Sequence, residues 1–339
     1  MSASPANPDR PNAEILVGGQ ALLEGVMMRT PGGYGVAVRR PDGSLALERG
    51  AVVPLSRRYP ALKLPLLRGV AVLGQSLAIG LRALNFSAAV LTEEPAAPQA
   101  PQPAAPQPAA PQPAAPQPRR GAGWLGALST ALAVALGLGI FLFLPLWLTE
   151  LAEAHGLGPM SSLVFNLCEG TLRAVFFLAY LLLIARLPDI HRVFMYHGAE
   201  HKVVFAQEAG GPLTVEGARR QSRLHPRCGT SFLLFVLLLS IFVFALVPRS
   251  LPLPAKFAGR LLLLPVLAGL SYEILRWTAK RARSPLFRVL VWPGLQLQRI
   301  TTQEPSDDML EVAIAALAES WSAERDAAVP APEPVAAAG

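Results

Sequence analysis

The stretch TSFLLFVLLLSIFVFALV, residues 230–247, contains neither a charged side chain nor a proline. A helix that crosses the hydrocarbon core of a bilayer needs about 20 mostly apolar residues, and this stretch approaches that length. Similar apolar stretches lie at 124–148, 163–187 and 257–275. Together they predict a mainly α-helical membrane protein with four transmembrane helices.

The composition agrees with lipid rather than water as the main solvent. Of 339 residues, 52% are hydrophobic and only 16% are charged, which is unusual for a soluble chain. The net charge of +7 could point to nucleic acid, but the basic residues cluster beside the apolar stretches. A membrane protein needs such flanking charge in any case, so we expect no nucleic-acid partner.

The charges of the connecting segments predict an orientation. Residues 149–162 contain two glutamates and no lysine or arginine, whereas residues 186–229 contain seven lysines and arginines. Basic residues also precede the first apolar stretch and follow the last. By the positive-inside rule, both termini and the long middle loop face the cytoplasm. The N-terminus lacks the features of a cleaved signal peptide, so we expect a multi-pass protein of the bacterial inner membrane.

Composition divides the chain into seven predicted segments. They are a disordered N-terminus (1–13), a β-rich cytoplasmic unit (14–62), an amphipathic interfacial helical segment (63–93), a Pro/Ala/Gln-rich linker (94–120), the four-helix core with its cytoplasmic loop 188–229 (121–300), an amphipathic C-terminal helix (301–322) and a disordered tail (323–339). The linker repeats PQPAA, which favours extended polyproline structure.

The β-rich unit is predicted from alternation and turn residues. VAVRR and SLALER flank Pro41-Asp42-Gly43, which indicates a hairpin. We interpret GGQALLEGVMMR, just upstream, as one strand interrupted by glycines. Residues 64–91 are apolar but carry Arg68 and Arg82, which suits a helix lying at the membrane interface. A fifth span is the competing interpretation, and it would upset the orientation of the other four.

Two helical patterns carry further predictions. Glu169 and Arg173 lie four residues apart in the second apolar stretch, which a spanning helix tolerates if the two side chains pair or face the bundle. In the C-terminal segment Ser306 is a candidate N-cap, and Leu310, Ile314 and Leu317 form one apolar stripe. This helix therefore needs a partner surface, which a partner protein could supply.

The middle loop holds the strongest chemical signal. MYHGAEHKVVFAQE, residues 195–208, places His197, Glu200 and His201 in an H-x-x-E-H arrangement. Histidines four apart share one face of a helix, so both imidazoles can reach one metal ion. In the inverzincin pattern two such histidines bind zinc and the glutamate acts as general base. The alternative is that the histidines are interface residues paired with Glu200 or with lipid phosphate.

A zinc site of this kind requires a third protein ligand. His225 and Cys228, in SRLHPRCGTSF, lie at the cytoplasmic entry to the third predicted helix. Glu273, in SYEILRW, lies at the cytoplasmic exit of the fourth. The predicted orientation brings all three candidates to the same membrane face as the histidine pair.

Several segments, taken together, resemble the YqhQ-like family of bacterial membrane proteins, a domain of unknown function. The matching segments are GGQALLEGVMMRTP (18–31), YHGAEHKVV (196–204), LTVEGARRQSRLHPRCGTSF (213–232), SYEILRW (271–277) and ITTQEPSDDMLEVAIAAL (301–318). The resemblance implies an integral membrane protein, sometimes labelled a predicted metal-dependent enzyme, and supplies no substrate.

Two functions from different classes follow. The first is a metal-dependent hydrolase, with zinc as the expected divalent metal and a lipid-linked or membrane-peptide substrate taken from the bilayer. His197 and His201 would be ligands, Glu200 the base, and His225, Cys228 or Glu273 the closing ligand. The second is a non-catalytic scaffold or assembly factor in which the His/Cys cluster is structural. A transporter has less support, because no inverted repeat is visible.

Overall fold

The structure is a computed structural model that describes residues 17–93, 123–210, 212–226, 228–279 and 285–328. The strands are β1 (Gly18–Leu22), β2 (Gly25–Arg29), β3 (Gly33–Arg39) and β4 (Leu45–Ala51). The helical elements are α1 (Leu55–Arg58), η1 (Pro60–Lys63), α2 (Leu67–Thr92), α3 (Gly123–Leu138), η2 (Gly139–Phe143), α4 (Leu144–Ala152), η3 (Glu153–Leu157), α5 (Ser162–Ile184), α6 (Pro188–Glu208), α7 (Val215–Arg219), α8 (Gly229–Phe244), α9 (Leu253–Ala279), α10 (Pro285–Thr301) and α11 (Asp307–Ala328). The predicted N-terminus 1–13, the linker proper (94–120) and the end of the tail lie outside the described residues.

The four strands form one antiparallel sheet in the order β1-β2-β3-β4. The predicted hairpin at Pro41-Asp42-Gly43 is confirmed, since Arg39 of β3 pairs with Leu45 of β4 and Gly43 has a φ of +85°. The interpretation of GGQALLEGVMMR as a single strand was wrong. It folds as a second hairpin, in which Leu22 pairs with Gly25.

A tertiary contact explains this second hairpin. Its turn residue Glu24 has a φ of +50°, a conformation that non-glycine residues rarely adopt. Arg192 of α6 donates two hydrogen bonds of 2.5 Å to the Glu24 carboxylate, and the Tyr196 hydroxyl adds a third at 3.2 Å. The Arg192 guanidinium lowers the pKa of Glu24. Glu24 thus connects the sheet to α6. The residues next to Glu24 in the sequence do not predict this contact.

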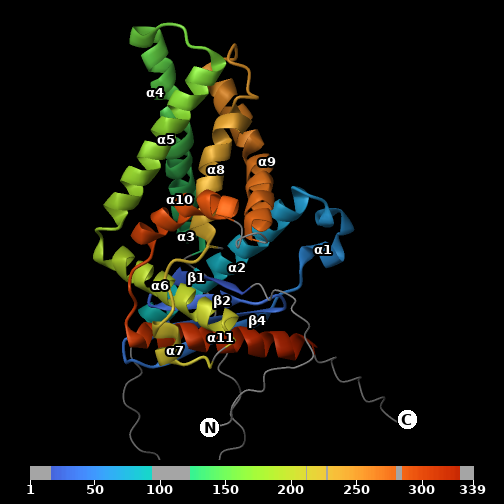
Figure 1. The fold of residues 1–339 in the computed structure, drawn as a ribbon, viewed down its shortest axis with the longest axis vertical. Coiled ribbons are helices and arrows are strands. Elements are labelled where there is room, and N and C mark those ends of the chain that lie inside the picture. The colour runs from blue at the N-terminus through green and yellow to red at the C-terminus, as the bar shows by residue number, and fades with distance from the viewer. Residues whose placement is uncertain (1–16, 94–122, 211, 227, 280–284, 329–339) are drawn as a thin grey trace, which may run out of the picture.

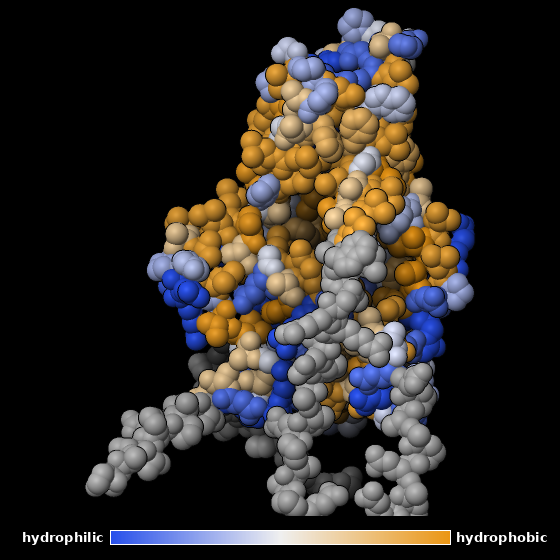
Figure 2. Space-filling model, turned by 180° about the vertical axis from the view of Figure 1, so that it is seen from behind, coloured by the Kyte–Doolittle hydropathy of each residue, from blue (hydrophilic) through white to orange (hydrophobic). Residues whose placement is uncertain are grey.

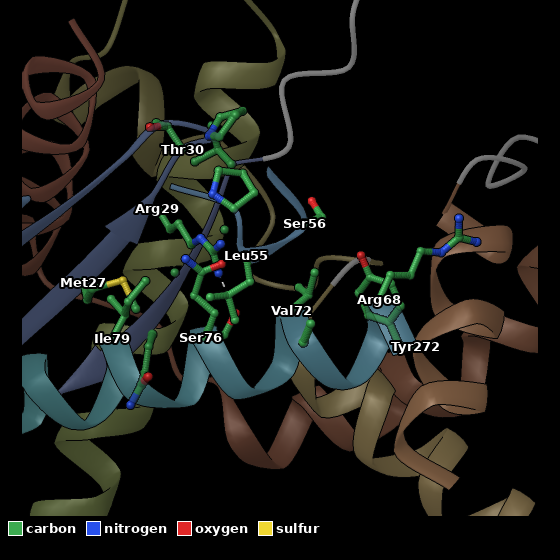
Figure 3. A pocket seen from close by; sticks show the side chains of 18 of the residues that line it. Met27, Arg29, Thr30, Leu55, Ser56, Arg68, Val72, Ser76, Ile79 and Tyr272 are labelled. Atoms are coloured by element: carbon green, nitrogen blue, oxygen red, sulfur yellow. Dashed lines mark hydrogen bonds between the residues drawn. The ribbon is translucent and has the colours of Figure 1, made fainter. Parts of the chain in front are cut away.

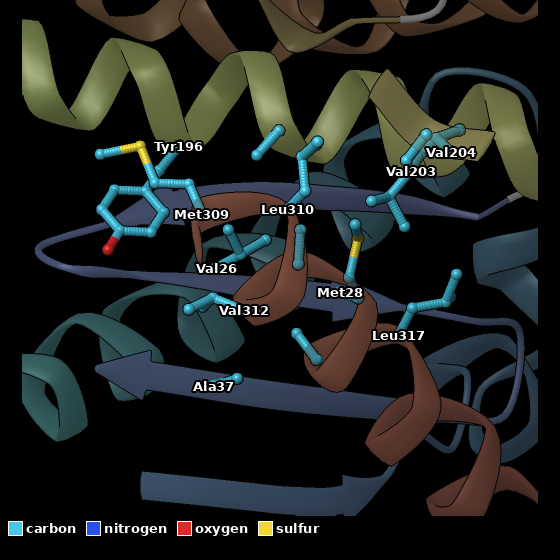
Figure 4. Close-up of a cluster of buried hydrophobic side chains, with 14 of the residues drawn as sticks. Val26, Met28, Ala37, Tyr196, Val203, Val204, Met309, Leu310, Val312 and Leu317 are labelled. Carbon is cyan, nitrogen blue, oxygen red and sulfur yellow. The ribbon is translucent and has the colours of Figure 1, made fainter. Parts of the chain in front are cut away.

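Alternate residues of the sheet face two different helical layers. Val26 and Met28 of β2 pack with α6 and α11, as Figure 4 shows, whereas Met27 between them packs with α2. The predicted C-terminal helix is present as α11, and Leu310 and Leu317 of its stripe are fully buried in this core. Its partner surface is therefore the sheet of the same chain.

A bundle of long helices rises from the sheet layer, as Figure 1 shows. Four helical stretches are long and apolar enough to cross a membrane, namely 67–92, 128–156, 162–184 and 253–278. Figure 2 shows a largely hydrophobic surface over the bundle, with hydrophilic residues gathered at its far end and around the base. The prediction of four apolar spans and a small N-terminal sheet is confirmed at this level.

The set of four differs from the predicted one in two places. The helix in the stretch that we expected at 230–247 is α8, which covers only Gly229–Phe244 and is shorter than the other candidates. At 1.5 Å per residue its 16 residues span roughly 24 Å. Conversely, α2 meets the length and composition of a span although one of its faces packs on the sheet.

Candidate metal centre

Helix α6 carries the two histidines of the H-x-x-E-H motif into the interior. It begins with Pro188 in its first turn and an acidic residue, Asp189, beside it, both of which favour a helix start. His197 and His201 lie on one face, and their ring centroids are 4.5 Å apart. Although α6 is rich in polar residues, the strand β1 and α11 cover it, so most of its second half is buried.

Backbone carbonyls determine which ring nitrogen of each histidine is free. The Nδ1 atom of His197 lies 2.8 Å from the Thr301 carbonyl oxygen, and that of His201 lies against the Arg223 carbonyl. A carbonyl can only accept, so each Nδ1 carries the proton and donates it. In a neutral imidazole held in this way, Nε2 is the nitrogen that keeps its lone pair. Metal-binding histidines are usually held in this way.

Cys228 completes a three-residue group with the two histidines. It is the N-cap of α8, where its sulfur accepts from the Thr230 N–H at 3.4 Å, and it lies 3.2 Å from Nε2 of His197. The ligand atoms of His197, His201 and Cys228 all lie within 4.8 Å of one another. Ligands of a tetrahedral zinc ion lie roughly 3.3–3.8 Å apart, so a small inward adjustment would suit that ion.

One ligand atom of this group lacks a conventional hydrogen bond. Nε2 of His201 is buried and has no such partner among the described residues. Burial lowers the pKa of His201, while the neighbouring Cys228 raises it. A buried, unprotonated nitrogen that points into a cluster of ligand types is what a resident metal ion would satisfy. The donor set therefore fits a divalent metal.

Glu200 lies at the edge of the same group. Its Oε2 is 3.9 Å from Nε2 of His197, and its side chain is 8% exposed. Burial raises the pKa of Glu200, and His197, His225 and the Gly19 backbone N–H lower it in part. A buried carboxylate with an elevated pKa, next to candidate ligands, has the properties of a general base.

The structure separates the three candidates for the closing ligand. Cys228 joins the histidine pair. His225 lies outside this group of three. Its ring centroid is 5.8 Å from that of His201, and its Nε2 is 3.5 Å from Oε1 of Glu208. Burial lowers the pKa of His225 to about 4. Glu273 is held elsewhere, because Arg68 of α2 donates to it from Nε at 2.6 Å.

Sequence reasoning missed the groups that hold these side chains in place. Gln298 of α10 accepts from the His225 N–H at 2.7 Å and donates to its carbonyl at 2.8 Å. Thr301, at the end of the same helix, fixes His197 through its carbonyl. Every residue has a backbone carbonyl, so no pattern of residue types could have pointed to it. The one signal in the motif itself is its glycine, Gly198.

Gly198 allows the closest of these approaches. A Cβ atom added to it would lie 2.0 Å from the carbonyl oxygen of Gln303, in the segment that follows α10. We therefore expect Gly198→Ala to push that segment away from α6, destabilise the fold by about 1–3 kcal/mol and weaken metal binding. Thermal unfolding and metal content measure both effects. Gly74→Ala on α2, where nothing lies within 4 Å of an added Cβ, should leave both unchanged.

The fold and the cluster define a class of protein: a mostly helical chain with candidate membrane spans, a small sheet and a buried His/Cys group. Comparison with known proteins gives its family. A family model described as "Protein of unknown function (DUF1385)" matches residues 64–323. The chain belongs to this family, which confirms the resemblance noted from its motifs.

A curated relative extends the match over most of the chain. The Bacillus subtilis (strain 168) protein named "Uncharacterized protein YqhQ" is 36% identical over 308 residues, which cover 88% of this chain and 89% of the relative. No solved structure matches the chain. The family thus supports a shared fold, and the chemistry has to be argued from the residues themselves.

Proposed function

We propose that this chain is a multi-pass protein of the bacterial inner membrane and a metal-dependent hydrolase whose site lies at the cytoplasmic membrane face. The observation that carries the proposal is the group formed by His197, His201 and Cys228, whose ligand atoms lie within 4.8 Å of one another. Imidazole nitrogens and thiolate sulfurs are ligands of zinc, and a site with three protein ligands leaves a fourth position for water.

The membrane part of the proposal is supported by where the charges lie. At the far end of the bundle Arg249 pairs with Glu153, and Lys256 pairs with Glu150 at 2.5 Å. The basic residues of that end are therefore neutralised. The lysines and arginines of the α6–α8 region lie at the other end, beside the sheet, which favours a cytoplasmic sheet layer.

Helix α2 fits this arrangement best at the membrane interface. Ala83 and Val90 pack on the sheet, and the Ser87 hydroxyl donates to the Leu23 carbonyl at 2.5 Å. Arg82 pairs with Glu48 of β4. A spanning α2 would draw these charged strands into hydrocarbon, which costs several kcal/mol per charge. The core would then cross the membrane through the α3–α4, α5, α8 and α9 segments.

The chain's own groups support hydrolysis around such a centre. His197, His201 and Cys228 would hold the metal, and a bound divalent ion supplies a Lewis acid and an activated water. The Thr301 and Arg223 carbonyls keep the two imidazoles oriented. Glu200, buried and close to His197, would accept a proton at its carboxylate oxygen and return it to the leaving group.

Metal analysis of the detergent-purified full chain tests the proposal. We expect about one divalent ion per chain in native protein, with zinc favoured over iron or manganese by the thiolate. The double substitution His197→Ala and His201→Ala should abolish it. His191→Ala, an exposed histidine of the same helix, should not. Metal-free native protein, or equal metal in the double variant, would contradict the proposal.

A further inference from the structure

A cavity of about 580 Å³ lies between the sheet and the first helices. Figure 3 shows it between β2, the α1–η1 segment and α2, with Tyr272 of α9 at one end. Side chains such as Met27, Leu55 and Val72 make much of its wall apolar. The volume falls within the range of about 300–1,000 Å³ that is typical of sites for small ligands.

Among the described residues that line this cavity, Arg29 is a cation without a carboxylate partner. Arg29 of β2 donates from Nη1 to the Ser76 hydroxyl at 2.6 Å, and no carboxylate of the described residues pairs with it. Arg29 is half-buried, and this burial lowers the pKa of its guanidinium. Arg68 also lines the cavity, but Glu273 neutralises it. Within the described residues, the cavity therefore offers the Arg29 guanidinium to an anionic ligand.

The segment next to the cavity has the character of a membrane anchor. Residues 53–67 expose large apolar side chains, among them Val53, Tyr59 and Leu64. Arg57, Arg58 and Lys63 are exposed among them. Apolar, aromatic and basic side chains in alternation suit the boundary between head groups and acyl chains. The cavity thus opens beside a segment that is suited to the boundary between lipid head groups and acyl chains.

From these features we infer that the cavity binds a membrane lipid through its phosphate head group. Arg29 and the Ser76 hydroxyl pair with the phosphate oxygens, since guanidinium matches phosphate in geometry and charge. The apolar walls hold the first part of the lipid chains. A peptide is the poorer occupant, because the described lining contains two arginines and no carboxylate, which suits an anion.

The cavity also lies next to the candidate metal centre. Gly18 and Gly19 of the edge strand β1 line it without side chains. An added Cβ on Gly19 would lie 2.8 Å from Cγ of Glu200, so only the backbone of this strand separates the two sites. A bound lipid would then be the substrate of the metal centre, and this last step rests on the proposed function. The inference that the cavity binds a lipid is independent of that function.

Native mass spectrometry of the detergent-purified full chain tests the binding. Dioleoylphosphatidic acid should bind the wild type about tenfold more tightly than it binds Arg29→Gln, because a charged hydrogen-bond partner is lost. Dioleoylglycerol, which has the same chains without phosphate, should bind both weakly. Val72→Phe, which narrows the cavity and keeps Arg29, should also weaken binding. Arg82→Gln, an exposed residue of the same helix, should bind as the wild type does.

Each of the opposite results would overturn the inference. If folded Arg29→Gln or folded Val72→Phe binds phosphatidic acid with an affinity within twofold of the wild type, the cavity is not the binding site. Equal binding of dioleoylglycerol would exclude the phosphate contact, and displacement by millimolar inorganic phosphate would indicate a site for free phosphate. Metal content, measured on the same samples, keeps this result separate from the proposed function.

Discussion

The variant Glu169→Gln is expected to lose about 3–5 kcal/mol of stability, the largest effect that we predict for a single substitution away from the metal centre. Glu169 of α5 is 1% exposed and lies inside the helical bundle. It pairs with Arg173 of the same helix, one of the two arrangements that the spacing allowed, and also with Arg260 of α9, whose Nη1 lies 2.6 Å from Oε1. One carboxylate therefore serves two buried guanidinium groups.

The remaining contacts of the two arginines cannot replace that carboxylate. Arg173 donates to the Phe141 carbonyl at 3.0 Å and to the Ser240 hydroxyl. The ring of Phe244 lies 4.8 Å from the guanidinium carbon of Arg173 and 5.3 Å from that of Arg260. Such cation–π contacts contribute about 2 kcal/mol or more when desolvated, but an aromatic ring carries no negative charge to neutralise a guanidinium. Without Glu169, two positive charges would repel each other in a dry interior.

Thermal unfolding in detergent, followed by circular dichroism, measures the effect. Glu153→Gln, which breaks a pair with Arg249 at the far end of the bundle, should cost less than about 1 kcal/mol because that pair is partly exposed. Adding Arg260→Gln to Glu169→Gln should restore part of the loss. An unchanged melting temperature in Glu169→Gln would show that the bundle opens to water at this point.

Apolar length and local turn signals made much of the fold predictable. The stretches 163–187 and 257–275 were visible because a helix in lipid needs a long run without charge. The hairpin at Pro41-Asp42-Gly43 was visible because its turn residues are adjacent in sequence. The apolar stripe of α11 predicted that one face of this helix packs against another surface. In the structure that surface is the N-terminal sheet, nearly 300 residues away in the chain.

The features that were not predictable depend on contacts between distant segments. Arg260 could not be assigned to Glu169, because nothing local links α5 to α9. The turn at Glu24 forms through Arg192, far along the chain. At the candidate centre, the spacing of the two histidines on one helix predicted that they share a face. That Cys228 is the third member of the group depends on how α8 packs near α6. Glu273 matched the expected membrane face and lies in an ion pair instead.

The variant Glu200→Gln separates the hydrolase from the scaffold. We expect it to keep its metal and to lose activity by a factor of roughly 10²–10⁴, the usual contribution of a general base. In a deletion strain it should then fail to complement, as the His197→Ala and His201→Ala double variant should. A scaffold with a structural His/Cys cluster predicts the opposite, because an amide of the same shape would leave its surfaces intact.

The structure gives reasons to expect that Glu200→Gln folds and binds metal. Glutamine has the size of glutamate, its carbonyl can still accept from the Gly19 N–H, and burial of a neutral amide avoids the desolvation that raises the pKa of Glu200. The three ligand atoms closest to one another come from His197, His201 and Cys228. Glu216→Gln, the same exchange at an exposed site on α7, should complement fully. Loss of metal from Glu200→Gln would make Glu200 a ligand, and full complementation by it would favour the scaffold.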